Sequence, residues 1–339
     1  MIRIIIYGMG NRGKDFIQYV KRLSVDMVVI AVSDSYIQTL KIDEDIPFIK
    51  LSDIPNYVFD YIVVTPKDHY EDIKKNFLDI GIDENKIKSI KDIYQEYGRF
   101  YYGYLTNNDL YCNLCDNHVS VWCYIGLEYN LFHKKKIIGG SRRRGGCPIC
   151  GGSDRERYVY YILKSYINLM DGRQHSILHF APEDFLSTRL RQICGSKYIS
   201  ADIVPGRADV VADITRLDFA DETFEYMVCN HVMEHIDLER KAFSEIKRCL
   251  IVGGVLILTV PICWEQKTFE DSTINSEEAR IKYYGQKDHV RLYGNDIVER
   301  IKSFGFHVTL LRCDEVVNEN DISKYGFIKE DSVLLCKKK

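Results

Sequence analysis

Two pairs of cysteines have the spacing of a metal site. Cys112 and Cys115 form one CxxC pair, and Cys147 and Cys150 form the second, which is followed by two glycines. A CxxC turn directs two thiolates at one ion, and two such turns complete the tetrahedral sulfur set that structural zinc prefers. In a chain without a secretory pattern, such pairs favour metal over disulfides. We therefore predict a zinc ribbon whose two turns are joined by a long hairpin.

Two basic triplets lie between these pairs, Lys134-Lys135-Lys136 and Arg142-Arg143-Arg144. On a mobile loop they would meet phosphate groups, either of RNA or of a nucleotide-sugar. The alternative is a solvated, charged loop tip, which is the usual role of a run of charges.

A glycine-rich turn near the N-terminus could bind a nucleotide. The apolar run over residues 2–7 leads into GMGNRG, in which Gly8, Gly10 and Gly13 have the GxGxxG spacing. A predicted helix follows, and the next predicted strand ends just before Asp34. Such glycines let a phosphate approach a helix N-terminus, and the acid bonds a ribose hydroxyl. We expect NAD(P) or a nucleotide-sugar here; in the alternative, the glycines only pack the helix against the strand.

The turn in ILHFAPEDFL also lies between a predicted strand and a predicted helix, as the GMGNRG turn does, but it contains no glycine. Ala181 is small enough for a ligand to come close, and Pro182 fixes its own φ and stiffens the turn. Glu183 supplies a carboxylate where the helix dipole favours one. The turn is either a stiff ligand loop that places an anion or a loop that has lost its ligand, in which Glu183 is only a first-turn acid.

The elements around these turns predict an α/β fold class. Strands alternate with helices over residues 1–97 and again over residues 159–339, which is typical of doubly wound sheets. We expect two Rossmann-like domains, separated by a connector and zinc-ribbon module over residues 98–158. In the second sheet, Gly253-Gly254 is expected to turn the chain into the strand VLILTVP. Ligands of such sheets bind at the carboxyl ends of the first strands.

Longer stretches resemble known families. ADITRLDFADETFEYMVCNHVMEHIDLERKAFSEIKRCLIVGGVLILTVP resembles the class I methyltransferases that use S-adenosylmethionine (SAM). CPICGGSDRERYVYYIL followed by ILHFAPE resembles a bacterial group of these enzymes, which carries a zinc ribbon before the catalytic domain and reads A-P-E in the cofactor loop. YGMGNRGKDFIQYV is similar to small nucleotide-binding domains attached to bacterial enzymes that modify glycans and nucleotide-sugars.

The methyltransferase resemblance implies SAM as the cofactor and suggests which residues bind it. Glu183 would hold the ammonium group of the methionyl part, and Asp202 would bond the ribose hydroxyls. Asp213 and Ile214 would border the adenine, and Asn230 would face the methyl-transfer space. In the alternative, Asp202 and Asp213 only cap the ends of strands.

Several titratable side chains are candidates for the chemistry. A hydroxyl acceptor benefits from a general base, for which His289, Asp288 and His231 are the candidates. His289 could instead be a loop histidine that bonds backbone, and Glu234 with His235 could serve structure or catalysis.

The acceptor itself is less well determined. Arg291 could hold a phosphate or carboxylate, and Trp264 and Tyr284 are expected to wall the pocket. We predict O-methylation of a sugar, glycan or nucleotide-sugar, in polysaccharide biosynthesis. The alternatives are an RNA methyltransferase that uses the basic ribbon, and a non-catalytic protein that binds a nucleotide or nucleotide-sugar.

Composition limits the class of protein. The net charge is −3 and the pI is near 6.3, so the whole chain is not a polyanion binder. No apolar run approaches the roughly 20 residues of a membrane span, and the chain opens on a strand without a signal-peptide pattern. We therefore expect a cytoplasmic protein. We expect its acceptor to be a small molecule or a glycan.

Overall fold

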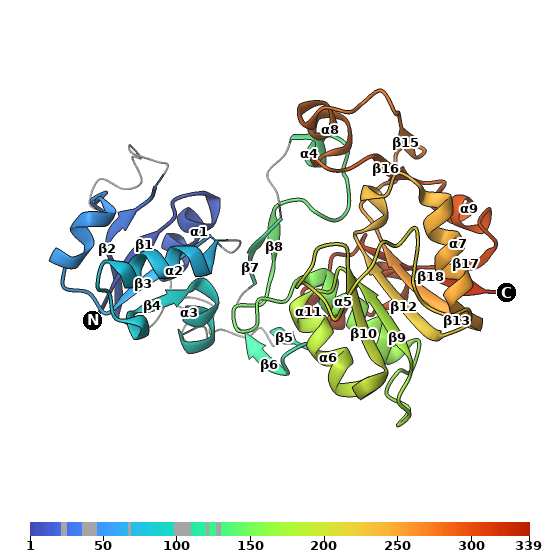
Figure 1. Ribbon diagram of the computed structural model, residues 1–339, viewed down its shortest axis with the longest axis horizontal. Coiled ribbons are helices and arrows are strands. Elements are labelled where there is room, and N and C mark those ends of the chain that lie inside the picture. The colour runs from blue at the N-terminus through green and yellow to red at the C-terminus, as the bar shows by residue number, and fades with distance from the viewer. Residues whose placement is uncertain (22–25, 36–45, 67–68, 98–109, 120–121, 127–129) are drawn as a thin grey trace. The chain divides into compact units, whose positions relative to one another are not determined.

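The computed structural model describes residues 1–21, 26–35, 46–66, 69–97, 110–119, 122–126 and 130–339. These residues form two compact units, the first made of 1–123 and 147–151 and the second of 124–146 and 152–339 (Figure 1). Most of the connector expected before the zinc ribbon lies at 98–109, outside the described residues. None of the described helices is long and apolar enough to cross a membrane.

A small parallel sheet forms the N-terminal part of the first unit, with the strand order β2-β1-β3-β4 (Figure 1). Successive side chains of a strand point to opposite faces. Ile4 and Ile6 pack in one cluster with Phe16 of α1, and Ile5 packs in a second cluster with Phe77 of α2. The sheet is therefore covered on both faces. Its elements are β1 (Ile2–Tyr7), α1 (Asn11–Val20), β2 (Met27–Ser33), η1 (Leu51–Asn56), β3 (Tyr61–Val64), α2 (Tyr70–Asp79), η2 (Glu84–Lys86), β4 (Ile87–Ser89) and α3 (Ile90–Tyr97).

The rest of the first unit is built around the two cysteine turns. β5 (Leu110–Cys112) pairs antiparallel with β6 (Asn117–Val119), and the first CxxC turn joins them. The second turn is closed by a hydrogen bond from the Gly151 amide to the Cys147 carbonyl, at 2.9 Å.

The second unit contains a seven-stranded sheet in the order β11-β10-β9-β12-β13-β18-β17. β18 is antiparallel to both of its neighbours, and the other pairs are parallel. The predicted α/β sheet of the C-terminal region is confirmed. Its strands are β9 (Ile177–Phe180), β10 (Tyr198–Asp202), β11 (Val210–Val211), β12 (Phe224–Asn230), β13 (Leu250–Thr259), β17 (Phe306–Arg312) and β18 (Ser332–Lys338). Its helices are α5 (Asp154–Ser165), α6 (Asp184–Cys194), η4 (Gly195–Lys197), η5 (Met233–His235), α7 (Glu239–Cys249), α9 (Ile297–Lys302), α10 (Cys313–Val316) and α11 (Glu319–Tyr325).

The expected turn at Gly253-Gly254 is wrong, because β13 runs through both glycines. The pairing of β12 with β13 shifts register between Phe224 and Tyr226, and Gly253 has φ +80°. The glycines therefore make an irregularity inside a strand, where a positive φ is accessible without a Cβ.

The segment between the cysteine pairs also differs from expectation, because residues 124–146 belong to the second unit. Phe132 and Ile137 pack in a cluster with Cys263 and Tyr284, and Ile138 bridges to Ile262. The segment is docked rather than a free hairpin tip. It contains the end of β7 (Cys123–Ile125), α4 (Asn130–Lys134) and β8 (Arg143–Gly146), and it packs beside β14 (Ile262–Cys263), β15 (Phe269–Glu270), α8 (Glu277–Tyr284) and β16 (Arg291–Gly294).

Candidate functional site

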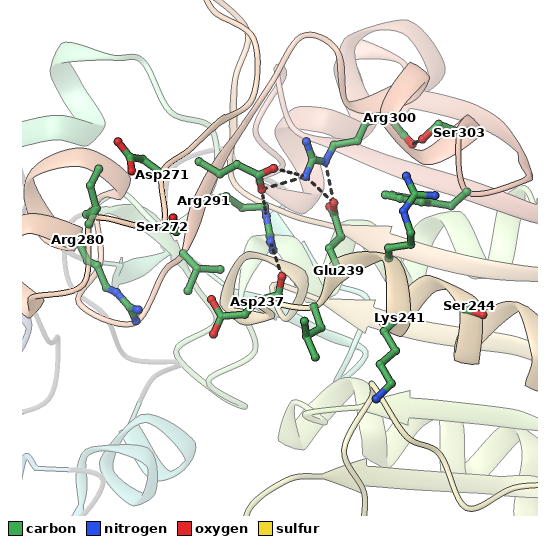
Figure 2. Close-up of a pocket in the computed structure, with 16 residues that line it drawn as sticks. Asp237, Glu239, Lys241, Ser244, Asp271, Ser272, Arg280, Arg291, Arg300 and Ser303 are labelled. Atoms are coloured by element: carbon green, nitrogen blue, oxygen red, sulfur yellow. Dashed lines mark hydrogen bonds and ion pairs between the residues drawn. The ribbon is translucent and has the colours of Figure 1, made fainter.

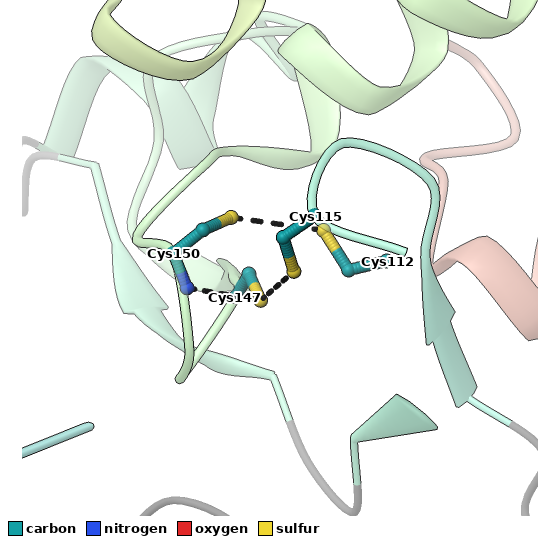
Figure 3. Close-up of side chains that lie close together, drawn as sticks. All are labelled: Cys112, Cys115, Cys147 and Cys150. Carbon is teal, nitrogen blue, oxygen red and sulfur yellow. Dashed lines mark hydrogen bonds between the residues drawn. The ribbon is translucent and has the colours of Figure 1, made fainter. Parts of the chain in front are cut away.

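The four predicted metal ligands lie together in the first unit (Figure 3). The sulfur atoms of Cys112 and Cys150 are 3.8 Å apart, as are those of Cys115 and Cys147. A tetrahedron with Zn–S bonds of about 2.3 Å has sulfur atoms about 3.8 Å apart, so the spacing fits zinc. Hydrogen bonding among the four thiols, with Cys112 as the first partner, lowers the pKa of Cys115 and raises the pKa of Cys147 and Cys150. These residues fit a structural zinc ion.

The glycine-free turn follows β9 in the second unit. Ala181 has φ +45°, in the left-handed region, and its amide donates to the Ala201 carbonyl at 2.8 Å. A left-handed residue with a Cβ costs roughly 1–2 kcal/mol, so this position is one that normally calls for glycine. The small side chain of alanine therefore keeps the backbone of a glycine turn.

Glu183 is the N-cap residue of α6 and is held by side chains from three elements. Its Oε2 atom lies 3.0 Å from His179 Nε2 and 3.4 Å from Asn230 Nδ2, and Oε1 lies 3.6 Å from an Arg155 guanidinium nitrogen. Burial works to raise the pKa of Glu183, but the His179 hydrogen bond and the Arg155 charge outweigh it, so the pKa lies below its usual value. The carboxylate is a fixed anion at the carboxyl end of β9.

The two expected ribose and adenine contacts lie at the ends of neighbouring strands. Asp202 Oδ1 accepts the Val204 amide at 2.8 Å, and Asp213 Oδ1 accepts the Thr215 amide and hydroxyl, both at 2.8 Å. One oxygen of each acid therefore caps a loop, as the structural alternative predicted. Ile214 is 5% exposed and packs in the sheet core.

Asn230 is the last residue of β12, and His231 follows it. Asn230 is 4% exposed, and its Oδ1 accepts the Thr259 hydroxyl at 3.0 Å. His231 has φ +51°, and burial holds its pKa well below its usual value, so the ring is neutral at pH 7. The docked segment rests on this ring, because a Cβ on Gly139 would lie 2.8 Å from His231 Cε1.

The other two base candidates do not pair with each other. Asp288 lies 3.4 Å from His235 Nδ1, and the rings of His235 and His289 meet edge to face with centroids 4.7 Å apart. Burial first, and then the charge of His235, lowers the pKa of His289 to about 4. Beside them, burial raises the pKa of Glu234 to about 8, and His231 Nδ1 lies 3.4 Å from its Oε1.

The predicted substrate contacts of Arg291 and Tyr284 are not supported by their surroundings. Arg291 is 3% exposed and donates to the carbonyls of Met233 and Ile236 at 2.7 and 2.6 Å. Tyr284 is 1% exposed, and its hydroxyl donates to the Asp271 carbonyl at 3.1 Å. Both side chains therefore hold the protein's own backbone. Trp264 packs against the sheet core under the Arg312 guanidinium.

A large cavity, of about 1110 Å³, lies beside Arg291 at the start of α7 (Figure 2). Its wall is charged, and some of the charges neutralise one another. Glu270 lies 2.9 Å from both Arg291 and Arg300, and Arg300 lies 2.6 Å from Glu239. This network stabilises part of the wall, and Arg240, Lys241 and Arg280 line the cavity outside it.

A second cavity, of about 860 Å³, lies between the docked segment and α8. Lysines dominate its polar lining, and Phe269 and Tyr283 add aromatic faces. The lysines are Lys134, Lys135, Lys267 and Lys282. A cavity of this size and lining suits an anionic ligand that carries a ring.

The basic triplets are not a mobile loop tip in the described structure. Arg143 forms a bidentate pair with Asp154, with both distances 2.6 Å, and Lys136 lies 2.7 Å from Glu265. Arg142 and Arg144 both lie over the Tyr124 ring. These contacts attach the segment to the second unit.

The N-terminal glycine turn is tightly packed. A Cβ on Gly8, which has φ +96°, would lie 2.6 Å from Pro66, and one on Gly13 would lie 2.1 Å from the Gly8 carbonyl oxygen. Gly10 has open space around it. Asp34 Oδ2 accepts the Met9 amide at 2.6 Å, so the predicted ribose ligand braces the turn.

Sequence reasoning missed Arg155 and His179 as partners of Glu183. His179 is a fully buried polar residue in the otherwise apolar strand ILHF, and a buried polar group needs a partner. Arg155 stands in SDRER directly after the second CxxC turn, and only the packing of α5 against α6 brings it to the site.

Comparisons with known proteins find similarity in two regions of the chain. Residues 186–258 match the family model described as methyltransferase domain, and residues 1–88 match the one described as C2185-like, N-terminal. The uncharacterized protein MJ1123 of Methanocaldococcus jannaschii is 28% identical over 97 residues, which are 29% of this chain and 45% of that protein. The match thus covers less than half of that relative.

Solved structures of two methyltransferases are also similar. A SAM-dependent methyltransferase from Archaeoglobus fulgidus has 18% identity and a TM-score of 0.35, with 54% of this chain and 94% of that chain covered. The 1,6-didemethyltoxoflavin-N1-methyltransferase of Burkholderia thailandensis, solved with S-adenosylhomocysteine, has 16% identity and a TM-score of 0.36. The match covers 54% of this chain and 77% of that chain.

The methyltransferase match extends from within α6 into β13. It includes the predicted cofactor residues Asp202, Asp213, Ile214 and Asn230, and it begins after the turn of Ala181, Pro182 and Glu183. The part of the C-terminal unit over residues 186–258 is therefore similar to methyltransferase domains.

Proposed function

We propose that this protein is a SAM-dependent methyltransferase that methylates a hydroxyl of a sugar, glycan or nucleotide-sugar. The observation that carries the proposal is the arrangement at the carboxyl ends of β9, β10 and β12. A left-handed turn at Ala181, a fixed anion at Glu183 and the strand-end acid Asp202 follow the first two of these strands, and Asn230 ends the third. Doubly wound sheets bind their ligands at this edge.

SAM supplies an electrophilic methyl group when it is bound. Glu183 would hold its ammonium group, and Asp202, through the oxygen that does not cap the loop, would bond the ribose. Pro182 keeps the turn stiff, so Glu183 stays in place without the ligand. Asn230, fixed by Glu183 and Thr259, would orient the reacting groups.

The lysine-lined cavity supports an acceptor with phosphate groups, such as a nucleotide-sugar. Four lysines would meet the charges of a diphosphate, and Phe269 and Tyr283 would stack on a base or sugar. Its position beside the docked segment gives that segment a role in acceptor binding. The N-terminal sheet would bind a second nucleotide-bearing group, and the protein would act in polysaccharide biosynthesis.

The basic triplets give less support to the RNA alternative than an open loop would. Lys136 and Arg143 are paired with Glu265 and Asp154, and Arg142 and Arg144 lie over the Tyr124 ring. Only Lys134 and Lys135 of the triplets line the second cavity.

A methyl-transfer assay with labelled SAM tests the proposal. Nucleotide-sugars, neutral glycans and RNA are offered to the zinc-loaded protein and to the Lys134→Ala, Lys282→Ala double variant. We expect transfer to nucleotide-sugars, and a rise in KM of about 10-fold or more in the variant, from two lost charge contacts. Lys164→Ala, on the exposed side of α5, is the matched control. Transfer to RNA alone, or no transfer to any acceptor, would contradict the proposal.

A further inference from the structure

Three side chains with potential metal-ligand atoms lie close together just after the carboxyl end of β12. Glu234 and His235 lie in η5, which follows β12, and His289 lies just before β16. One potential ligand atom from each lies within 4.8 Å of the other two. Glu234 is 1% exposed and His289 is 3% exposed, so the group is almost closed to bulk water.

Two of the three side chains have buried polar atoms that make no hydrogen bond, although His231 Nδ1 lies 3.4 Å from Glu234 Oε1. Neither oxygen of Glu234 nor the Nδ1 atom of His289 makes a hydrogen bond to any described residue. Leaving a buried polar group unpaired costs about 1–3 kcal/mol, and native structures pair most of them. Carboxylate oxygens and an imidazole nitrogen have lone pairs in common, so the missing partner is a proton or a cation.

The surrounding structure holds the three side chains in place. The Val290 amide donates to the Glu234 carbonyl at 2.9 Å, and Arg291 donates to the carbonyls on either side, of Met233 and Ile236. These bonds tie the two ligand-bearing segments together. Asp288 lies 3.4 Å from His235 Nδ1, the position of a carboxylate that orients a metal-binding imidazole through its other nitrogen.

We propose that Glu234, His235 and His289 bind one divalent transition-metal ion at the acceptor side of the methyl-transfer site. Two imidazoles and one carboxylate are a ligand set of catalytic zinc and of non-haem iron, and the set leaves coordination positions open. The ion is distinct from the zinc of the four cysteines, which belong to the other unit.

The role of this ion rests on the proposed function. An acceptor hydroxyl that enters the open position would be more acidic, and it would pass its proton to a water molecule that enters with the acceptor. The hydroxyl oxygen then forms the new O–C bond with the methyl group, while the C–S bond breaks and its electron pair stays on sulfur. The site therefore selects acceptors that offer an oxygen ligand, such as the hydroxyls of a sugar.

The test is a calorimetric titration of Zn²⁺, Co²⁺ and Mn²⁺ into the full-length protein, purified with its cysteine site loaded with zinc. The variants are Glu234→Gln and His289→Ala, with His307→Ala on the exposed face of β17 as the control. Asp288→Asn is added because loss of an orienting carboxylate lowers metal affinity by about 10- to 100-fold. Binding of S-adenosylhomocysteine is measured on every variant, to show that the domain is folded.

We expect about one further ion per chain in the wild type and in His307→Ala, beyond the zinc of the cysteines. Glu234→Gln and His289→Ala should lose this binding, and Asp288→Asn should weaken it. If the wild type binds S-adenosylhomocysteine but no further ion, the metal proposal is wrong and the proposed function stands. If it binds the ion but not S-adenosylhomocysteine, the proposed function fails and the metal site stands. Equal binding by the wild type and both ligand variants would also overturn the site.

Discussion

Each compact unit of this protein contains a turn that joins the first strand of its sheet to a helix, and the two turns differ in sequence and in role. The turn after β1 is rich in glycine, yet Gly8 and Gly13 serve close packing, and Asp34 braces the Met9 amide. The turn after β9 has no glycine, yet Ala181 adopts a left-handed conformation and Glu183 stands as a fixed anion. Glycine content therefore does not tell which turn adopts a left-handed conformation beside a fixed anion. The position and charge of the polar groups around the turn are more informative.

The largest effect is expected at Gly13. A Cβ there would lie 2.1 Å from the Gly8 carbonyl oxygen, whereas one on Gly10 would meet nothing within 4 Å. We expect Gly13→Ala to lower the free energy of unfolding of the N-terminal part by about 3 kcal/mol, the upper range for overpacking. Gly10→Ala is the matched control and should change it little. Denaturant unfolding measures both, and equal stability of the two variants would show that the turn is not packed as described.

The next effect is expected at Glu183. Replacing its carboxylate by an amide in Glu183→Gln removes the anion proposed to hold the SAM ammonium group. We expect the affinity for S-adenosylhomocysteine to fall by about 10- to 100-fold, since a hydrogen bond to a charged group contributes about 1.5–3 kcal/mol. Calorimetry measures the change, with the exposed Glu278→Gln as the control. Unchanged affinity would make Glu183 a structural cap, like Asp34.

A smaller effect tests the backbone at Ala181. Because its φ is +45°, Ala181→Gly should raise the free energy of unfolding by up to about 1 kcal/mol, and Ala181→Val should lower it by about 1–2 kcal/mol. The glycine variant should still bind S-adenosylhomocysteine. Thermal unfolding gives the comparison, with Ala220→Gly in an exposed loop as the control. If Ala181→Gly lowered the free energy of unfolding and Ala181→Val left it unchanged, the left-handed conformation of Ala181 would be contradicted.

The smallest effect is expected at Asp34. Asp34→Asn keeps an acceptor for the Met9 amide but removes its charge, so we expect a loss of about 1 kcal/mol in the stability of the N-terminal part. Hydrogen exchange of the Met9 amide should report the change directly. Protection that is the same in both proteins would mean that the bond contributes nothing to the turn.

Much of the fold was predictable because its signals are local. The strand–turn–helix unit expected around ILHFAPEDFL is confirmed, with β9 as its strand and α6 as its helix. The predicted pairing of the cysteine turns also agrees with the close approach of their sulfurs. The turn expected at Gly253-Gly254 failed because glycine marks either a turn or an irregular strand, and pairing with β12 decides between them.

The remaining features depend on contacts between distant segments. The docking of Phe132 and Ile137 against Cys263 joins residues far apart in sequence, and no periodic pattern reports it. Arg291 was expected at a substrate, because a single sequence shows its charge but not the backbone carbonyls that surround it. For the same reason, the convergence of Glu234, His235 and His289 emerged only from the structure.

The most direct test of the central claim is the binding of S-adenosylhomocysteine to the wild type, Asp202→Ala and Asp34→Asn, measured by titration calorimetry on zinc-loaded protein. Asp218→Ala, an exposed acid near Asp213, serves as the control. We predict that the wild type, Asp34→Asn and Asp218→Ala bind with similar affinity and that Asp202→Ala loses binding by about 10-fold or more. Binding that survives in Asp202→Ala but is lost in Asp34→Asn, or no binding by the wild type, would contradict the assignment of the cofactor to the glycine-free turn.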